Sequence, residues 1–496
     1  MRVAAVSAIN DADFFVVVRS ILSIQSFACD AIVRPTLSQY KVSLRKHSWA
    51  GDCCCGRERN INDTARESGE PVETLLVVGA GPKALAVAAK SHVLRNLGLP
   101  APRVVVVEAH AVGGNWLPSG GWTDGQHRLG TSPEKDIGFP YRSTWARGHN
   151  QAINAAMKAF SWTSFLVEHG TFAEWIDRGR PSPHHHTWAR YLQWVARAID
   201  LDLVIGTVRS IRQGDNGWSV SVTDAEGRDT ELAADGLMIT GPGRSTKTLA
   251  EHARILSIAE FWELAGRRAL PAASRAAVIG GGETAGSALD ELVRHEMLTI
   301  SVISPMATIY TRGESYFENA LFSDPSKWAA LSMQERRDVI RRTDRGVFSV
   351  RVQENLLGDN RVHHLQGRVV RVADHADGVA VTLRNELRAD QVHAFDLAID
   401  ATGGQPLWFL ELFDSYAMDL LELAVGGPLT QPRLESSIGY DLAVSGLASK
   451  LYLPNLAALA QGPGFPNLSC LGELSDRVLS PEPARAGSGA RRLVVR

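Results

Sequence analysis

Two glycine-rich turns in this chain have the residue types and spacing that bind a dinucleotide. Residues 79–84 read GAGPKA and residues 280–285 read GGGETA, and each turn follows a short apolar run and opens a helical pattern. Such a turn brings backbone amides and the positive end of a helix dipole close to a pyrophosphate. One turn alone is weak evidence. Two in one chain indicate that two dinucleotides meet, as in flavin and nicotinamide redox chemistry.

The first turn has the parts of a dinucleotide-binding strand–turn–helix unit. Residues 75–78 form an apolar run of strand length, and a helix is predicted over residues 82–97, beginning at Pro82. Gly79 permits the tight turn, and Gly81 lets the backbone approach a pyrophosphate. These features predict that the turn binds a dinucleotide.

Two further positions support a dinucleotide site. Ala84 replaces the third glycine of the usual pattern and still permits close packing of the helix on the strand. The next predicted strand, over residues 104–107, ends at Glu108, whose carboxylate can accept hydrogen bonds from both ribose hydroxyls. The alternative is a glycine-rich turn that holds no ligand, but strand, turn, helix, strand and acid all stand in the expected order.

The second turn repeats this architecture and predicts a nicotinamide site. A strand is predicted over residues 276–279, a helix over residues 283–296 and the next strand over residues 299–304. A site for the 2′-phosphate of NADPH would place an Arg near the end of that last strand, where Ser304 stands, although Arg312 is close enough in sequence to serve. A duplicated fold without a cofactor is the alternative.

Length, charge and cysteine content fit a redox enzyme of two or three domains. The chain has 496 residues and a formal net charge of −2, so no nucleic acid partner is indicated. Its five cysteines show no CxxC or CxxxxC pair after either turn, which argues against a dithiol reductase and a disulfide framework. No apolar run reaches the length of a membrane span, and we expect a cytoplasmic protein. We expect no metal site, because the consecutive histidines at 184–186 rarely converge on one ion.

A polar, turn-rich loop between the two turns offers a cation for a substrate. Residues 113–116 read GGNW directly after the strand that ends at Glu108, and residues 127–136 read HRLGTSPEKD. Only nine of the 52 basic residues are lysines, and Lys135 lies in this loop rather than on a solvated helix face. Its ammonium can hold a substrate carboxylate. The alternative is a surface lysine paired with Asp136.

Several long segments resemble the N-hydroxylating flavin monooxygenases of siderophore biosynthesis, which act on lysine or ornithine. Within that family the chain looks closest to the lysine N(6)-monooxygenases of mycobactin-type pathways. The resemblance implies an α/β fold with two Rossmann-like dinucleotide-binding domains, an FAD domain with an inserted NADPH domain, and a small helical substrate cap. It covers roughly residues 74–479 and rests on residues 120–125, 129–143, 171–181, 278–285, 317–325 and 462–479.

The resemblance also implies roles for individual residues. Lys135 matches the position that binds the carboxylate of the substrate amino acid, and Asn319 matches a catalytic Asn that contacts substrate and nicotinamide. Ser469 matches a substrate-binding residue in a C-terminal segment that closes over flavin and substrate. The implied cofactor-binding residues are Gly79, Gly81, Pro82, Ala84, Glu108, Trp116, Asn467 and Leu468 for FAD, and Gly280, Gly282, Glu283 and Thr284 for NADPH.

The implied reaction is hydroxylation of a lysine side-chain amine by O₂, FAD and NADPH. A nicotinamide hydride reduces FAD, the reduced flavin adds O₂ to give a C4a-hydroperoxide, and the amine takes up its distal oxygen. The amine must be neutral, yet at a reference pKa near 10.4 only about one lysine amine in 2,500 is neutral at pH 7. The substrate is free lysine or a lysine-containing siderophore precursor, and the product supplies hydroxamates for a mycobactin-like siderophore. A homo-oligomer is compatible with the family, although the sequence shows no interface.

Four departures from the pattern of the family keep other functions open. Glu283 stands where Gln or Ser is frequent, and Ser304 stands where an Arg is expected. Asp400 and Gly404 replace an apolar and an aromatic residue. One alternative is therefore a non-catalytic or uncoupled flavoprotein with a weakened nicotinamide site. The other is a different class B flavin monooxygenase, although residues 261–266 lack the Phe-x-Gly-x₃-His pattern of those enzymes.

The order of these features predicts five segments. The helical stretch over residues 408–448 is expected to cap the substrate pocket. The segments are a disordered extension over residues 1–73, the first part of the FAD domain over 74–241, an NAD(P)H domain over 242–394, an FAD-domain return segment with the helical cap over 395–479, and a disordered tail over 480–496.

Overall fold

Every residue described below belongs to the unit Glu70–Arg496. The predicted extension and tail lie outside the described residues, apart from Glu73 and Ser480. The computed structural model describes residues 73–118, 121–145, 148–214, 217–243, 249–356, 358–376, 378–385 and 388–480.

The first glycine turn follows the central strand of a parallel sheet of five strands. The run RVVVVE of β2 is rich in the β-branched residue Val, which favours strands, and four of the five residues of β1 are buried. The order is β18-β7-β1-β2-β3, with β18 at Lys450–Tyr452, β7 at Gly236–Ile239, β1 at Thr74–Val78, β2 at Arg103–Glu108 and β3 at Asp202–Ile205.

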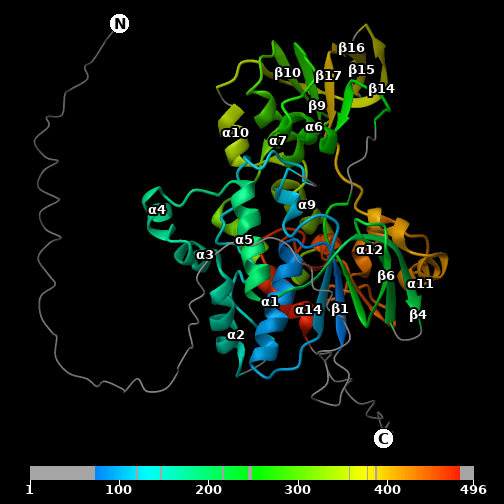
Figure 1. Ribbon diagram of the computed structural model, residues 1–496. Coiled ribbons are helices and arrows are strands. Elements are labelled where there is room, and N and C mark those ends of the chain that lie inside the picture. The colour runs from blue at the N-terminus through cyan, green and yellow to red at the C-terminus, as the bar shows by residue number, and fades with distance from the viewer. Residues whose placement is uncertain are drawn as a thin grey trace, which may run out of the picture. The chain divides into compact units, whose positions relative to one another are not determined.

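Helix α1 (Pro82–Asn96) leaves this turn and is buried along most of its length. Pro82 occupies the start of the helix, where its missing N–H is not needed. Helix α14 (Leu471–Leu479) packs beside α1, as Figure 1 shows, so the C-terminal segment returns to the first turn. A buried ion pair joins the two helices, with Nζ of Lys90 on α1 at 2.5 Å from Oδ1 of Asp476 on α14.

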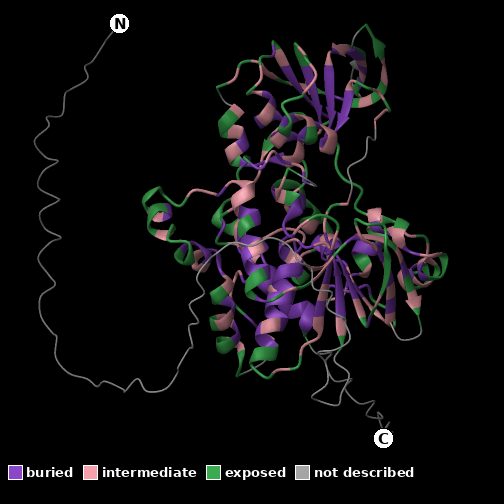
Figure 2. Ribbon diagram, viewed as in Figure 1, coloured by how far each residue is buried: buried purple, intermediate pink, exposed green. Residues whose placement is uncertain are grey.

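The second glycine turn follows the central strand of another parallel sheet of five strands. Figure 2 shows the buried residues concentrated in the strands of both sheets. The order is β13-β10-β9-β17-β8, with β13 at Val362–Gln366, β10 at Thr299–Ser304, β9 at Arg275–Ile279, β17 at Leu397–Asp400 and β8 at Ile255–Ser257. Helices α6 (Ile258–Gly266) and α7 (Glu283–Leu292) pack on this sheet, and α10 (Val350–Leu356) packs against α7.

The two sheets confirm the predicted α/β fold with two Rossmann-like domains. Most predicted elements near the turns agree with the structure to within one residue, but α7 ends at Leu292 rather than at 296. The guanidinium of Arg361 donates hydrogen bonds to the carbonyls of Val293 (2.6 Å) and His295 (2.7 Å), which stabilises the non-helical chain beyond α7. This contact comes from a residue far along the chain and has no local signal.

One expected boundary is wrong in its position. The return segment was expected to begin at Phe395, but β17 pairs in parallel with β9 and β8 of the second sheet. The chain therefore leaves the second sheet only after Asp400 and rejoins the first sheet at β18. The cause is the apolar run Leu397–Asp400, which fills a central position between two buried strands. The other boundaries stay predictions.

The remaining elements are small sheets and short helices. Two antiparallel sheets contain β4 (Thr207–Gly214), β5 (Gly217–Thr223) and β6 (Asp229–Ala234), and β14 (Arg368–His375), β15 (Gly378–Asn385) and β16 (Arg388–Phe395), while β11 (Tyr310–Thr311) pairs with β12 (Val347–Phe348). The first part of the unit also contains η1 (Gly114–Trp116), α2 (Asn150–Met157), η2 (Lys158–Phe160), α3 (Trp162–Glu168), α4 (Phe172–Asp177) and α5 (His185–Ala198). The later part contains α8 (Tyr316–Ser323), η3 (Pro325–Ala330), α9 (Met333–Thr343), η4 (Trp408–Leu412), α11 (Ser415–Val425), α12 (Gln431–Ser437), η5 (Pro454–Leu456) and α13 (Ala458–Gln461). Among the described residues, no helix is long and apolar enough to cross a membrane.

The second turn depends on a glycine that no other residue can replace without strain. Gly280 has φ +147°, and a Cβ built there would lie 2.2 Å from the carbonyl oxygen of Ala401. We predict that Gly280→Ala lowers the free energy of unfolding by about 2–4 kcal/mol. Gly266→Ala is the matched control, because a Cβ there meets no atom within 4 Å, and its effect should stay within about 1 kcal/mol. Denaturant unfolding followed by circular dichroism measures both, and equal stability of the two variants would contradict the packing described.

Candidate functional site

The first turn presents uncapped backbone amides that fit a pyrophosphate. Gly81 is the N-cap of α1 and makes no side-chain cap hydrogen bond, and a Cβ built there would meet no atom within 4 Å. Glu108 braces the turn, because its Oε2 accepts a hydrogen bond from the amide of Ala80 at 2.8 Å and its Oε1 one from the amide of His110 at 3.0 Å. Free amides, open space and the positive end of α1 together suit an anion.

The predicted flavin loop lies directly after β2. Trp116 ends the short helix η1 and is half-buried against the core of the first sheet. The structure therefore places Trp116 near the first turn but outside the cavity described below. Gly79, Gly81, Pro82 and Ala84 likewise belong to the turn and not to that cavity.

The second turn has the same form but a more crowded surrounding. Gly282 is the N-cap of α7 and lacks a side-chain cap, so the first amides of this helix also remain available. A Cβ built on Gly282 would lie 3.8 Å from the amide nitrogen of Gly346. Thr284 follows in the first turn of α7 and is half-buried. The site fits a dinucleotide, with the loop around Gly346 as its neighbour.

The departures from the family pattern have specific partners in the structure. Glu283 accepts a hydrogen bond at its Oε2 from the amide of Ser349 at 2.7 Å. The hydroxyl of Ser304 lies 3.2 Å from Nε2 of His364. The carboxylate of Asp400 accepts a hydrogen bond from the hydroxyl of Thr402 at 2.7 Å. The side chains at these three departures thus have hydrogen-bond partners within their own domain, which sequence alone does not show.

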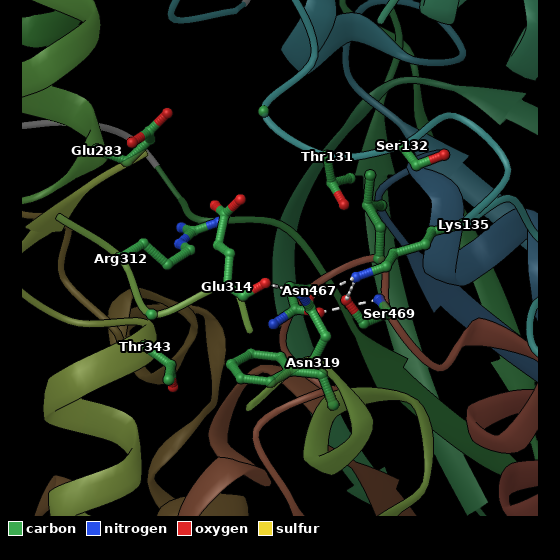
Figure 3. A pocket seen from close by; sticks show the side chains of 14 residues that line it. Thr131, Ser132, Lys135, Glu283, Arg312, Glu314, Asn319, Thr343, Asn467 and Ser469 are labelled. Atoms are coloured by element: carbon green, nitrogen blue, oxygen red, sulfur yellow. Dashed lines mark hydrogen bonds between the residues drawn. The ribbon is translucent and has the colours of Figure 1, made fainter. Parts of the chain in front are cut away.

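A cavity of about 320 Å³ lies between segments of the two Rossmann-like halves. This volume is at the lower end of the range of about 300–1,000 Å³ that is usual for small-molecule pockets. Figure 3 shows charged and polar side chains pointing into it from several segments. The lining residues are Gly130, Thr131, Ser132, Lys135, Glu283, Arg312, Gly313, Glu314, Asn319, Phe322, Thr343, Asn467, Leu468 and Ser469.

Lys135 joins the segments around the cavity. Its Nζ donates to Oδ1 of Asn319 at 3.3 Å and to the hydroxyl of Ser469 at 3.4 Å (Figure 3). Both contacts are long, and both acceptors are neutral. Burial lowers the pKa of Lys135, with a further lowering from Arg312 that is opposed by Glu314. The described residues thus leave the charge of Lys135 without a close carboxylate, and an anionic ligand would supply one.

Asp136 fixes the loop that carries Lys135. It is buried, and its carboxylate accepts hydrogen bonds from the hydroxyl of Tyr141 (2.7 Å) and the amides of Trp162 (2.9 Å) and Gly138 (3.1 Å). The expected alternative of a Lys135–Asp136 surface pair therefore does not occur. Burial nevertheless outweighs these hydrogen bonds and raises the pKa of Asp136 to about 6.

Arg312 and Glu314 form the opposite side of the cavity. Their side chains lie beside each other in Figure 3, and the Nε atom of Arg312 is buried without a hydrogen-bond partner among the described residues. Burial raises the pKa of Glu314, and the positive charges of Arg312 and Lys135 oppose this rise. Sequence reasoning named Arg312 only as a candidate for the 2′-phosphate and missed Glu314. The capping box of α8, Ser315 with Glu318, indicates that the residues before it end a loop, and this was the available signal.

The C-terminal segment closes the cavity from the side of the first sheet. Asn467 donates from Nδ2 to the carbonyl of Pro463 at 2.8 Å and accepts at Oδ1 from the amide of Ser469 at 2.9 Å. These bonds orient Leu468 and Ser469 into the lining. The helices of residues 408–448 contribute none of the described lining residues, so their role as a cap stays a prediction.

The histidines at 184–186 make local contacts. Nδ1 of His185 lies 2.9 Å from the hydroxyl of Thr123, and Nδ1 of His186 lies 2.8 Å from the carbonyl of Gly125. In the part of the chain that the structure describes, no group of three or more His, Cys, Asp or Glu side chains is arranged to hold a metal ion.

Comparison with known proteins assigns the chain to a family. The family model for L-lysine 6-monooxygenase/L-ornithine 5-monooxygenase matches residues 153–405. The chain is 55% identical over 413 residues to L-lysine N6-monooxygenase MbtG of Mycobacterium sp. (strain MCS), with 82% of this chain and 95% of that protein covered. The protein of the same name from Mycobacterium tuberculosis is 54% identical over 410 residues, with 82% and 94% covered.

One solved structure gives the same assignment, and another shows the same fold. The lysine monooxygenase NbtG from Nocardia farcinica, described as having an unprecedented NADPH domain conformation, is 82% identical and has a TM-score of 0.75, with 82% of this chain and all of that chain covered. The ornithine N-hydroxylase KtzI from Kutzneria sp. 744 is only 19% identical, covers 82% of this chain and 98% of its own, and with a TM-score of 0.64 shows the shared fold.

The high pKa of Asp136 makes a testable contribution to pH dependence. Because the folded protein raises this pKa from 3.8 to about 6, the contribution of the protonated group to stability is full below about pH 4 and is lost as the pH rises through 6. The free energy of unfolding of wild type, minus that of Asp136→Asn, should therefore fall by about 3 kcal/mol between pH 4 and pH 7. Denaturant unfolding at several pH values measures it, with the exposed Asp177→Asn as control. A rise with pH in the free energy of unfolding of wild type relative to Asp136→Asn would contradict the prediction.

Proposed function

Because the chain belongs to the L-lysine 6-monooxygenase/L-ornithine 5-monooxygenase family, we propose that it hydroxylates the side-chain amine of lysine with FAD, NADPH and O₂. The product would supply hydroxamate groups for a mycobactin-like siderophore. The relatives with about half of their residues identical are named L-lysine N6-monooxygenases, which supports lysine over ornithine.

One observation carries this proposal. Lys135 places a half-buried ammonium in a small-molecule cavity, and among the described residues its hydrogen-bond acceptors are the neutral Asn319 and Ser469. A buried ammonium that forms no close ion pair is costly, and the α-carboxylate of an amino acid would compensate it. An amino acid held in this way extends its side chain into the rest of the cavity.

The two turns would hold the two cofactors. The amides at Gly81, with Glu108 at the ribose position and Trp116 beside the flavin, would hold FAD. The amides at Gly282, with Gly280, Glu283 and Thr284, would hold NADPH. When bound, reduced FAD supplies the activated oxygen for the reaction.

The residues of the cavity would bind and orient the substrate. Asn319 and Ser469 contact the Lys135 ammonium and so would lie beside the substrate carboxylate, with Asn319 also facing the nicotinamide. Asn467 and Leu468, in the segment that carries Ser469, would lie against the flavin. Together they would exclude water from the reacting amine.

Burial in the cavity would favour the neutral amine that the reaction requires. Burial is the largest effect that lowers the pKa of Lys135, although Glu314 opposes it, and burial would lower the pKa of a substrate amine in the same way. Lys135 and Arg312 would repel a protonated substrate amine, whereas Glu283 and Glu314 would attract it. Desolvation would therefore prepare the nucleophile, without a dedicated general base.

The direct test of the proposed function is product formation. The purified FAD-loaded protein is incubated with NADPH and with lysine, ornithine or no amino acid, and hydroxylated amine, peroxide and NADPH oxidation are measured together. We predict lysine-dependent hydroxylamine, with little product from ornithine.

Other outcomes would contradict the proposal in distinct ways. Peroxide without hydroxylamine from either amino acid would exclude free lysine as the substrate. A FAD-loaded protein that NADPH does not reduce would indicate a flavoprotein with a weakened nicotinamide site. Product from ornithine alone would reverse the proposed chain-length preference.

A further inference from the structure

A second lysine of the first half contacts the C-terminal segment of the cavity. Lys83 is the second residue of α1, within the first glycine turn. Its Nζ donates a hydrogen bond to the carbonyl oxygen of Pro466 at 2.6 Å. Pro466 immediately precedes Asn467, Leu468 and Ser469, which line the cavity.

This lysine is placed at some electrostatic cost. A cation near the N-terminus of a helix opposes the helix dipole, so no local benefit explains its position. Burial also lowers the pKa of Lys83 to about 8, against an opposing effect of Asp344. The carbonyl of Pro466 is the hydrogen-bond acceptor that offsets this cost.

The segment around Pro466 is held from two other sides as well. Gly464 is pressed against the end of α8, since a Cβ there would lie 2.0 Å from the carbonyl oxygen of Phe322. The guanidinium of Arg477 lies 4.6 Å from the ring centroid of Phe465. Lys83 supplies the contact from the first turn, so it links the FAD turn to the segment that carries Ser469.

We propose that Lys83 is a positioning residue, which holds the carbonyl of Pro466 and thereby fixes Asn467, Leu468 and Ser469 in the lining of the cavity. This inference rests on the proposed function, because the roles of these residues toward substrate and flavin are proposed there. It couples the two ends of the site, since the turn that would hold FAD also orders the segment that closes over the substrate.

The test compares Lys83→Met with the exposed Lys158→Met in the FAD-loaded full chain. Hydrogen–deuterium exchange of residues 462–471, the Kd of FAD, and the Kd of lysine from its perturbation of flavin absorbance are measured for each. We expect faster exchange in this segment and a lysine Kd raised about tenfold in Lys83→Met, the loss expected for one hydrogen bond from a charged group. The FAD Kd should stay within about threefold, and Lys158→Met should match wild type.

Two conservative variants keep the test sharp if Lys83→Met folds poorly. Lys83→Arg retains charge and donors and should restore slow exchange, whereas Lys83→Gln retains a donor without charge and should restore it in part. Unchanged exchange in Lys83→Met would overturn the inference. So would a large loss of FAD affinity with unchanged exchange, because Lys83 would then bind the cofactor instead of the segment. Faster exchange in a protein that binds no lysine would support the positioning role and contradict the proposed function.

Discussion

The hydrogen bonds of the Lys135 ammonium to Asn319 and Ser469 are the interaction on which the site depends. They join a loop of the first half, a helix of the second half and the C-terminal segment around one charge. Because both acceptors are neutral and both distances are long, the charge is only partly satisfied by the protein. The chain thus keeps electrostatic capacity for an anionic ligand, while Asp136 holds the loop through three hydrogen bonds of its own.

The same strand–glycine turn–helix unit occurs in both sheets. Each parallel sheet ends its central strand in a glycine turn with an uncapped helix N-terminus, as expected for dinucleotide sites at the carboxyl ends of strands. The second sheet is inserted between strands of the first, and α14 returns along α1 after it. The C-terminal segment therefore reaches the cavity that contains residues of the inserted half, a meeting that neither sheet alone provides.

The sequence predicts the parts of this arrangement that have local causes. The two glycine turns, Glu108 at the end of β2 and the loop position of Lys135 follow from short motifs, and the structure places each as expected. Lys83 and its acceptor Pro466 are 383 residues apart, so no local pattern encodes this contact. The capping box of α8 indicates only that Glu314 ends a loop, and not that it faces Lys135 across a cavity. The predicted end of α7 and the predicted boundary before β17 are wrong for the same reason. The distant Arg361 determines the first, and the pairing of β17 in the second sheet determines the other. The roles of the site residues and of the helices at 408–448 stay predictions.

The central claim is that Lys135 binds the carboxylate of the substrate and not its side-chain amine. The most direct measurement is a cycle of two proteins and two ligands, with calorimetric titration of lysine and of cadaverine, which lacks the carboxylate, into FAD-loaded wild type and Lys135→Ala. The account predicts that Lys135→Ala weakens lysine binding about tenfold or more and leaves cadaverine binding unchanged or slightly stronger. Equal losses for both ligands, or no loss for lysine, would contradict it.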